Sequence, residues 1–216
     1  MNESGKPSSF DDQTTVRRML DDTISHYERA PEAYWAGTKD HDVSQNYDAL
    51  LNAIEGDAPY VILDLGCGPG RDLMHFASLG HEAVGLDGTE SFVAMARAHS
   101  GCSVLHQDFL NMDLPRARFH GEFANASLFH VPSRDLPRVL REIAATLKPN
   151  GVLFSSNPHG GNHEGFHGGR YACFLDLESW RAYVTAAGFV ELAHYYRPSG
   201  LPREQQPWLA TVWRKA

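Results

Sequence analysis

Hydrophobic positions along the chain follow two different periods. Apolar residues that recur every three or four positions predict helices, and short apolar runs bounded by turn residues predict buried strands. The predicted helices span residues 14–29, 43–55, 71–79, 90–99, 134–147 and 176–187. The predicted strands span residues 60–65, 82–87, 103–107, 121–127, 151–156, 189–196 and 208–214. Strands that alternate with helices from residue 60 onward predict an α/β fold with helices on both faces of a mainly parallel sheet.

Turn and cap residues divide this pattern. Lys148-Pro149-Asn150-Gly151 ends one predicted helix, and Asp176 and Gly188 bracket another. Residues 157–175 are rich in Gly, His and Asn, so we predict a long loop there, of the kind that often forms a functional lid. A Pro- and Gln-rich turn at 197–207 predicts that the last two strands form a hairpin.

Composition limits the class of protein. A chain of 216 residues with 42% apolar and 21% charged residues predicts one folded domain, residues 13–216, behind a polar, disordered tail at 1–12. A net charge of −8 argues against a general nucleic-acid binder. The sequence shows neither a membrane-spanning apolar run nor a signal pattern, so we expect a cytoplasmic protein. Cys67, Cys102 and Cys173 are widely spaced, which predicts reduced thiols.

A glycine loop follows the first buried strand. Residues 61–65 lead into Gly66-Cys67-Gly68-Pro69-Gly70, and the next strand ends in Asp87. A strand, a glycine turn, a helix and a strand-end acid are typical of the nucleotide-binding half of a doubly wound sheet. The loop lacks the G-x-G-x-x-G pattern, and Asp64 stands just before it. An acid there would repel a pyrophosphate but suits a ligand with an ammonium group.

This stretch closely resembles the first motif of the class I S-adenosylmethionine (SAM) methyltransferases. The resemblance covers about residues 20–214 and is specific at the glycine loop, Asp87, Gln107-Asp108-Phe109 and the strand end 124–130. It implies a single Rossmann-like sheet of seven strands, the last one inserted antiparallel between the fifth and sixth. It also implies SAM as cofactor and a helical lid, residues 13–56, over a core at 57–216.

The resemblance implies a set of cofactor contacts. The methionine end of SAM would lie against Asp64, Gly66, Cys67, Gly68, Gly70 and Arg71. The nucleoside would meet Asp87 and Gly88 at the ribose, and Asp108 and Phe109 at the adenine. The sulfonium would lie beside Asn125 and be shielded by Tyr27 and Trp35 through cation–π contact. The alternatives are a glycine turn of another α/β protein, a helix cap for Asp87 and a solvated loop acid for Asp108.

The acceptor side is predicted from the same topology. His130 is the candidate general base, since an unperturbed imidazole titrates near neutral pH, and a structural histidine that caps the next helix is the alternative. His41 and Asp42 are further catalytic candidates, although Asp42 also suits the cap of a surface helix. Arginines can clamp a carboxylate in bidentate fashion. The substrate-binding candidates are Asn46, Phe129, Arg170, Tyr171, Tyr196 and Arg197.

We therefore predict a SAM-dependent methyltransferase, a monomer or homodimer. Its expected acceptor is a small polar, carboxylate-bearing metabolite, such as an amino-acid derivative methylated on nitrogen or sulfur. An RNA or protein methyltransferase is a second hypothesis, which the acidic charge weakens, and a non-catalytic SAM-binding regulator is a third. His159, His163 and His167 recur every four residues and could form a zinc site with Glu164 or Asp176, but so many glycines disfavour the helix this needs. We predict no metal, no membrane and no nucleic-acid partner.

Overall fold

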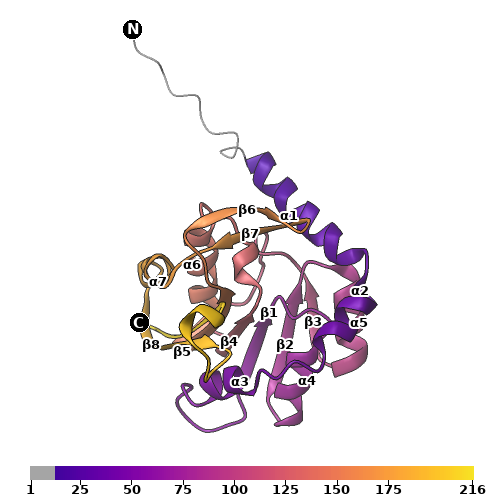
Figure 1. The fold of residues 1–216 in the computed structure, drawn as a ribbon. Coiled ribbons are helices and arrows are strands. Elements are labelled where there is room, and N and C mark those ends of the chain that lie inside the picture. The colour runs from indigo at the N-terminus through magenta and orange to yellow at the C-terminus, as the bar shows by residue number, and fades with distance from the viewer. Residues whose placement is uncertain (1–12) are drawn as a thin grey trace.

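The computed structural model describes residues 13–216, so the predicted tail lies outside the described residues. A seven-stranded sheet in the order β3-β2-β1-β4-β5-β9-β8 forms the centre of the fold (Figure 1). Its strands are β1 (Val61–Leu65), β2 (Glu82–Asp87), β3 (Ser103–His106), β4 (Phe119–Asn125), β5 (Leu147–Pro158), β8 (Phe189–Arg197) and β9 (Trp208–Lys215). Strands β1 to β5 run parallel, and β9 runs antiparallel to both its neighbours. The predicted fold class and the inserted last strand are confirmed.

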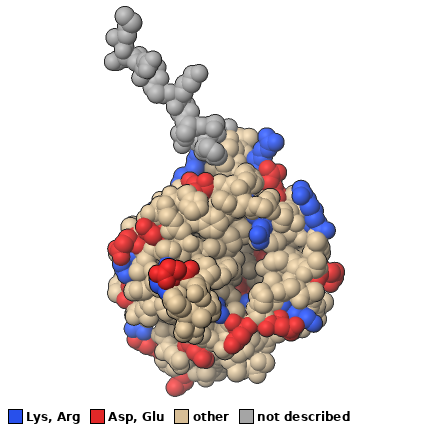
Figure 2. All heavy atoms as spheres, in the orientation of Figure 1, with Lys and Arg blue, Asp and Glu red and all other residues tan. Residues whose placement is uncertain are grey.

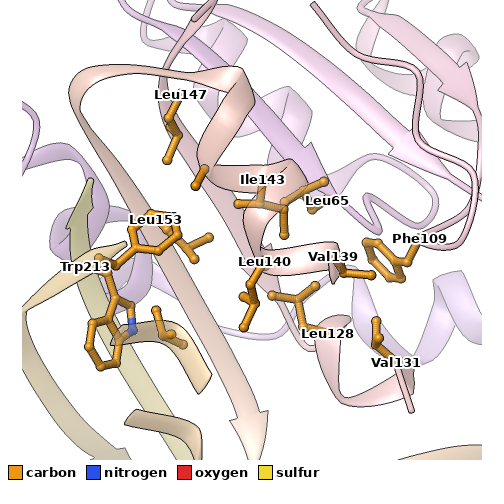
Figure 3. Packing of buried hydrophobic residues seen from close by; sticks show 14 of the residues in the cluster. Leu65, Phe109, Leu128, Val131, Val139, Leu140, Ile143, Leu147, Leu153 and Trp213 are labelled. Carbon is orange, nitrogen blue, oxygen red and sulfur yellow. The ribbon is translucent and has the colours of Figure 1, made fainter. Parts of the chain in front are cut away.

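Helices cover both faces of this sheet. They are α1 (Gln13–Glu28), α2 (Pro31–Thr38), α3 (Ser44–Leu51), α4 (Arg71–Ser78), α5 (Glu90–Ser100), α6 (Leu136–Thr146) and α7 (Leu177–Ala186), with short 3₁₀ turns η1 (Leu128–His130) and η2 (Arg203–Gln205). Side chains alternate across the sheet, so neighbouring residues such as Ile62 and Leu63 join separate apolar clusters. Ile62 packs with residues of α3, α4 and α5, whereas Leu63 packs with residues of α6 and α7. Figure 3 shows part of the cluster that contains Leu63. In this cluster, Leu140 and Ile143 of α6 lie near Leu65 and Leu153.

The predicted long loop at 157–175 is wrong in part. Residues 163–174 form an antiparallel hairpin of β6 (His163–His167) and β7 (Arg170–Phe174), joined through Gly168 and Gly169 at positive φ. The glycines that argued against a helix therefore supply the turn of a hairpin. Strand β7 lies beside α1 (Figure 1), and the Tyr171 amide donates to Thr23 Oγ1 at 2.9 Å.

Two other elements differ from the prediction. Helix α2 was not predicted, because Pro31 reads as a break, yet it occupies the first turn of the helix, where its missing N–H costs nothing. Residues 148–151, which we predicted as a turn, instead lie inside β5, where the pairing with β4 is irregular between the pairs Phe119–Leu147 and Gly121–Val152. Asp176 caps α7 as predicted, since its Oδ1 accepts from the Ser179 amide at 2.8 Å. None of the helices at 13–216 is long and apolar enough to cross a membrane.

A carboxyl group is buried in this core away from the cavities. Glu122 on β4 is fully buried, accepts from the Thr146 hydroxyl, and has no partner for Oε2. Burial raises the pKa of Glu122 to about 8. The folded state then holds a proton that the unfolded chain releases near pH 4.5. Stability from this group is present below pH 4.5 and is lost as pH rises toward 8, at about 1.4 kcal/mol per pH unit.

We expect Glu122→Gln to flatten the pH dependence of stability between about pH 5 and pH 8. The glutamine keeps an acceptor for Thr146 and never ionises. At alkaline pH the free energy of unfolding of the variant should therefore exceed that of wild type by on the order of 1–3 kcal/mol. Urea unfolding at several pH values measures this gain, with Glu142→Gln on α6 as the control. Curves for wild type and Glu122→Gln that stay parallel from pH 5 to 8 would contradict the assignment.

Candidate active site

Two adjoining cavities open beyond the carboxyl ends of the parallel strands. The large cavity has a volume of about 670 Å³ and lies among α2, the glycine loop, β7 and the turn after β8. The small cavity, of about 70 Å³, lies between α1 and the ends of β2 and β3. Figure 2 shows a hollow on this face, surrounded mainly by uncharged residues, with both basic and acidic side chains at its margin. The residues common to both cavities are Tyr27, Tyr34, Gly66, Gly68 and Ala126.

The three glycines of the loop, Gly66, Gly68 and Gly70, have positive φ angles, and they have different roles. A Cβ on Gly66 would lie 2.5 Å from Ser127 Cβ, and one on Gly70 would lie 2.8 Å from Ala96 Cα. Those two glycines let the loop pack against the rest of the fold. Gly68 differs, since a Cβ there would meet only Tyr34, at 3.8 Å, so its backbone faces the cavities. The space over Gly68 is the part of the loop that a ligand can approach.

Asp87 stands where β2 ends and binds two backbone amides. Its Oδ2 accepts from the Gly68 N–H and its Oδ1 from the Thr89 N–H, both at 2.8 Å. Burial raises the pKa of Asp87, and these two amides oppose the rise. Each carboxylate oxygen keeps a further lone pair, so a diol can bind without breaking either contact. Asp87 therefore supports the loop and the start of α5, and it also lines the small cavity.

Asp64 is buried beneath the glycine loop and has no hydrogen-bond partner for Oδ2. Burial raises the pKa of this carboxyl well above its ordinary value, and the nearby Asp72 raises it further. Asp64 lines neither cavity, but it lies two residues before Gly66, which lines both, and an unpaired buried acceptor there fits a cationic ligand group, such as the ammonium of an amino acid. The donor set thus suits the methionine end of SAM.

The small cavity has the acids and apolar surfaces expected around a nucleoside. Asp108 and Phe109 line it, together with Gly88. Asp108 is not free, because Arg17 on α1 donates to its Oδ2 at 2.8 Å and the Leu110 amide donates to Oδ1. Ile24 of α1 covers Gly88 so closely that a Cβ there would lie 2.9 Å from Ile24 Cδ1. Helix α1 therefore forms one wall of this cavity.

A network of polar side chains forms the floor of the large cavity. Arg71 binds Asp72 through two contacts of 2.6 and 2.9 Å, and Tyr47 donates to the same carboxylate at 2.5 Å. Asn125 donates to Asp72 Oδ2 at 3.4 Å and accepts from Asn46 at 3.0 Å. Sequence reasoning missed Asp72, although an acid in the first helical turn after a glycine loop was a usable signal.

His130 lies on the small cavity, with a partner on each ring nitrogen. Nδ1 is 2.6 Å from the Tyr171 carbonyl oxygen, and Nε2 is 2.9 Å from the Tyr27 hydroxyl. Burial lowers the pKa of His130 to about 4, and the charge of Arg170 lowers it too, although the Tyr171 carbonyl opposes this. His130 is therefore neutral at pH 7 and reaches the large cavity only through Tyr27. Its role as a general base stays a prediction, and any proton from the large cavity would have to reach His130 through the Tyr27 hydroxyl.

Most predicted site residues line one of the two cavities. Besides those described, the large cavity is lined by Trp35, His41, Asp42, Cys67, Phe129, Arg170 and Arg197. Asp42 also accepts from the Ser44 amide at 3.0 Å, but the N-cap position of α3 is Val43, so Asp42 is not the N-cap that the alternative expected. The functional roles of these residues stay predictions.

Three substrate candidates and two cofactor candidates, Asp64 and Gly70, lie outside both cavities. Asn46 is buried in the floor network, and Tyr196 stacks under Arg203, whose guanidinium is 3.5 Å from the ring centroid. The side chain of Tyr171 is buried against Glu164. Gly70 packs on α5. Their side chains or backbone face the protein, because the strands and helices that carry them turn those positions inward.

Sequence reasoning also missed residues that join the cavity walls from distant segments. Tyr34, Thr38, Val43, Pro69, Ala126, Ser156, Pro198 and Trp208 line the large cavity, and Leu20, Thr23, Ile24, Thr89, Phe92 and Gln107 line the small one. The lining residues on α1 could have been predicted from the helical period, but only after the structure shows that this helix covers the cavity. No local pattern marks Trp208, which the β8–β9 turn brings to the rim.

The three histidines spaced by four residues separate in the structure. His163 and His167 have ring centroids 5.8 Å apart on the β6–β7 hairpin, whereas His159 contacts Tyr196. Within residues 13–216, no group of three or more His, Cys, Asp or Glu side chains could hold a metal ion.

Comparisons with known proteins agree on the family. The profile of the "Methyltransferase domain" family matches residues 62–151. A ubiquinone biosynthesis O-methyltransferase from Rhodopseudomonas palustris is 33% identical over 107 residues, 48% of this chain and 40% of that protein. The enzyme of the same name from Nitrobacter winogradskyi is 31% identical over 174 residues, 75% of this chain and 64% of that protein. The chain thus spans less than two thirds of the length of these curated relatives.

Solved structures agree on the fold. The structure of the Burkholderia thailandensis 1,6-didemethyltoxoflavin N1-methyltransferase, with bound 1,6-didemethyltoxoflavin and S-adenosylhomocysteine, superposes with a TM-score of 0.73 and 22% identity. That match covers 100% of this chain and 93% of the other. These similarities support the enzyme class and the cofactor that the sequence predicts. Residues 62–151 thus match the methyltransferase-domain family, and the strand order is the one that the resemblance to the class I SAM-dependent methyltransferases implies.

Proposed function

We propose that this protein transfers the methyl group of SAM to a small, carboxylate-bearing acceptor. The observation that carries the proposal is the pairing of two unlike cavities at Gly68 and Tyr27. The small cavity offers Asp87 and Asp108, which suit a nucleoside, and the large cavity offers arginines, which suit an anion. The point where the cavities meet is where a methyl group would pass between them.

Two arginines face the large cavity from different segments. Arg170 comes from β7, and Arg197 comes from the end of β8, where it donates to the Asp42 carbonyl at 2.8 Å. Neither forms an ion pair with a carboxylate in the described part of the chain, whereas Arg71 is held by Asp72. Phe129 and Trp208 lie in the same cavity, with ring centroids 6.4 Å apart. Cations beside aromatic rings suit a planar acid.

The residues would supply binding and orientation. Asp64 would hold the ammonium of SAM, Asp87 its ribose hydroxyls, and the loop amides its carboxylate. SAM supplies an electrophilic methyl group when bound. The arginines would hold the acceptor in line with it, and such positioning contributes about 7–11 kcal/mol in well-oriented reactions. The lid role of residues 13–56, the cytoplasmic location and the oligomeric state stay predictions.

The acceptor atom separates two versions of this proposal. The amino-acid hypothesis places methyl on nitrogen or sulfur. The curated relatives favour a second candidate, O-methyl transfer, because the two reported are named ubiquinone biosynthesis O-methyltransferases. The site gives no support to RNA or protein acceptors. Few arginines lie at its rim, and the chain as a whole carries a net charge of −8.

A matched set of acceptors tests the proposal. Tritium transfer from methyl-labelled SAM would be measured with 3,4-dihydroxybenzoate, 3-aminobenzoate, 3-mercaptobenzoate and L-histidine, and with the carboxamide of each. We expect transfer to at least one acid and at least tenfold less to its amide. Equal transfer to acid and amide would remove the carboxylate from the proposal. Binding of SAM without transfer to any acid would favour the regulator instead.

A further inference from the structure

Three side chains from three separate elements meet where the two cavities join. Tyr27 comes from α1, His130 from η1, and Arg170 from β7. The Tyr27 oxygen lies 2.9 Å from His130 Nε2 and 3.1 Å from Arg170 Nη1. Tyr27 lines both cavities, His130 lines only the small one, and Arg170 lines only the large one. Tyr27 is therefore the member of this cluster that stands between cofactor and acceptor.

The direction of each hydrogen bond follows from the groups present. The Tyr171 carbonyl can only accept, so the His130 nitrogen 2.6 Å from it, Nδ1, carries a proton. In the neutral ring Nε2 is then an acceptor, and Tyr27 donates its hydroxyl proton to it. Arg170 can only donate, so it occupies one lone pair of the Tyr27 oxygen. The second lone pair remains for a proton on the acceptor.

We infer that Tyr27 is a catalytic residue that takes the acceptor's proton while passing its own to His130. His130 is the proton store behind it, and Arg170 holds the tyrosine oxygen in place. This inference rests on the proposed methyl transfer, and it applies to acceptors that lose a proton, such as a hydroxyl group, or an ammonium group whose nitrogen gives up its proton before it attacks.

The step balances in atoms and charge. The acceptor atom forms a bond to the methyl carbon, the carbon–sulfur bond breaks, and its electron pair goes to sulfur. The acceptor's proton moves to the Tyr27 oxygen, and the Tyr27 hydroxyl proton moves to Nε2 of His130. Tyr27 ends neutral and His130 ends as a cation, so one positive charge moves from the sulfur to the imidazole. The site as a whole keeps its charge, because the imidazole gains the positive charge that the sulfur loses.

The charges around the pair set its resting state. Burial raises the pKa of Tyr27, Asp87 raises it too, and Arg170 opposes the rise. Burial lowers the pKa of His130 to about 4, with Arg170 and His26 acting in the same direction. At pH 7 both groups are therefore neutral, with the proton on tyrosine. Below about pH 4 the imidazole is already protonated and cannot accept, so the relay operates at neutral pH and fails in acid.

Tyr27→Phe tests the relay, because it removes the hydroxyl but keeps the ring against Tyr34 and Phe92. With the best acid of the set above, we expect kcat to fall at least tenfold, while KM and the dissociation constant of S-adenosylhomocysteine change less than about threefold. Tyr60→Phe, which loses a hydroxyl bonded to the Gly56 carbonyl, should retain full activity. A Tyr27→Phe/His130→Gln double variant should be no slower than the slower single variant.

Nitrogen NMR of the His130 imidazole provides a readout that needs no acceptor. We expect Nδ1 protonated and Nε2 unprotonated at pH 7, with a shift at Nε2 in Tyr27→Phe. The reverse tautomer, or full kcat in Tyr27→Phe beside an active wild type, would overturn the relay and leave the proposed function intact. A wild type that binds SAM but methylates none of the acids would instead overturn the proposed function, and the relay with it.

Discussion

Asp87→Ala is expected to weaken the binding of SAM and S-adenosylhomocysteine by at least tenfold. The carboxylate would lose hydrogen bonds to two ribose hydroxyls, each worth about 1.5–3 kcal/mol before water compensates, and 1.4 kcal/mol is tenfold in affinity. The same change removes acceptors from the Gly68 and Thr89 amides, so stability should also fall by about 1–2 kcal/mol. Calorimetry at a temperature well below the unfolding transition measures binding alone.

Glu90→Ala is the matched control for this variant. Glu90 is an exposed acid three residues further along, at the start of α5, and lines neither cavity. It should bind SAM as wild type does. A folded Asp87→Ala protein with an unchanged dissociation constant would mean that Asp87 serves only the glycine loop and the start of α5.

Arg170→Ala is expected to lower turnover at least tenfold while S-adenosylhomocysteine affinity stays within about twofold. Arg170 faces the large cavity and not the small one, and its guanidinium also donates to the Tyr27 oxygen. Losing a charge-assisted contact to the acceptor costs more than about 1.4 kcal/mol, and losing the contact to Tyr27 slows proton transfer as well. Steady-state kinetics should therefore show a higher KM and a lower kcat.

Two other arginines separate these effects. Arg197→Ala should raise KM with little change in kcat, because Arg197 lines the large cavity but makes no contact with Tyr27. Arg203→Ala should leave both unchanged, since Arg203 stacks on Tyr196 outside both cavities. If Arg170→Ala and Arg203→Ala have the same kinetics, the acceptor binds elsewhere.

Most residues of the predicted cofactor half line one of the two cavities, for a physical reason. Gly66, Gly68 and Asp87 act through backbone positions and a strand end, and local pattern specifies both. The fold class was equally accessible, because buried strands and amphipathic helices alternate along most of the chain from residue 60. Asp108 lies where it was predicted, but its ion pair to Arg17 joins residues 91 positions apart, and no local pattern encodes such a contact.

The acceptor half was harder to predict because it is assembled from segments distant in the chain. The 157–175 segment has the composition of a loop, yet its glycines form the turn of a hairpin that brings Arg170 to Tyr27. The histidine spacing suggested a metal as one alternative, while the histidine that contacts the site residues, His130, has both nitrogens engaged by residues far from it. Tyr196 was predicted at the acceptor face from the topology of the sheet, but it stacks with Arg203 and lies outside both cavities.

Titration calorimetry of the wild-type protein with S-adenosylhomocysteine, SAM and NAD tests most directly whether the two cavities serve methyl transfer. We expect both sulfur compounds to bind at one site per chain, and NAD to show no binding at the same concentrations, because Asp64 disfavours a pyrophosphate at the glycine loop. Absence of SAM and S-adenosylhomocysteine binding, or tighter binding of NAD, would contradict the assignment of the cofactor site and everything built on it.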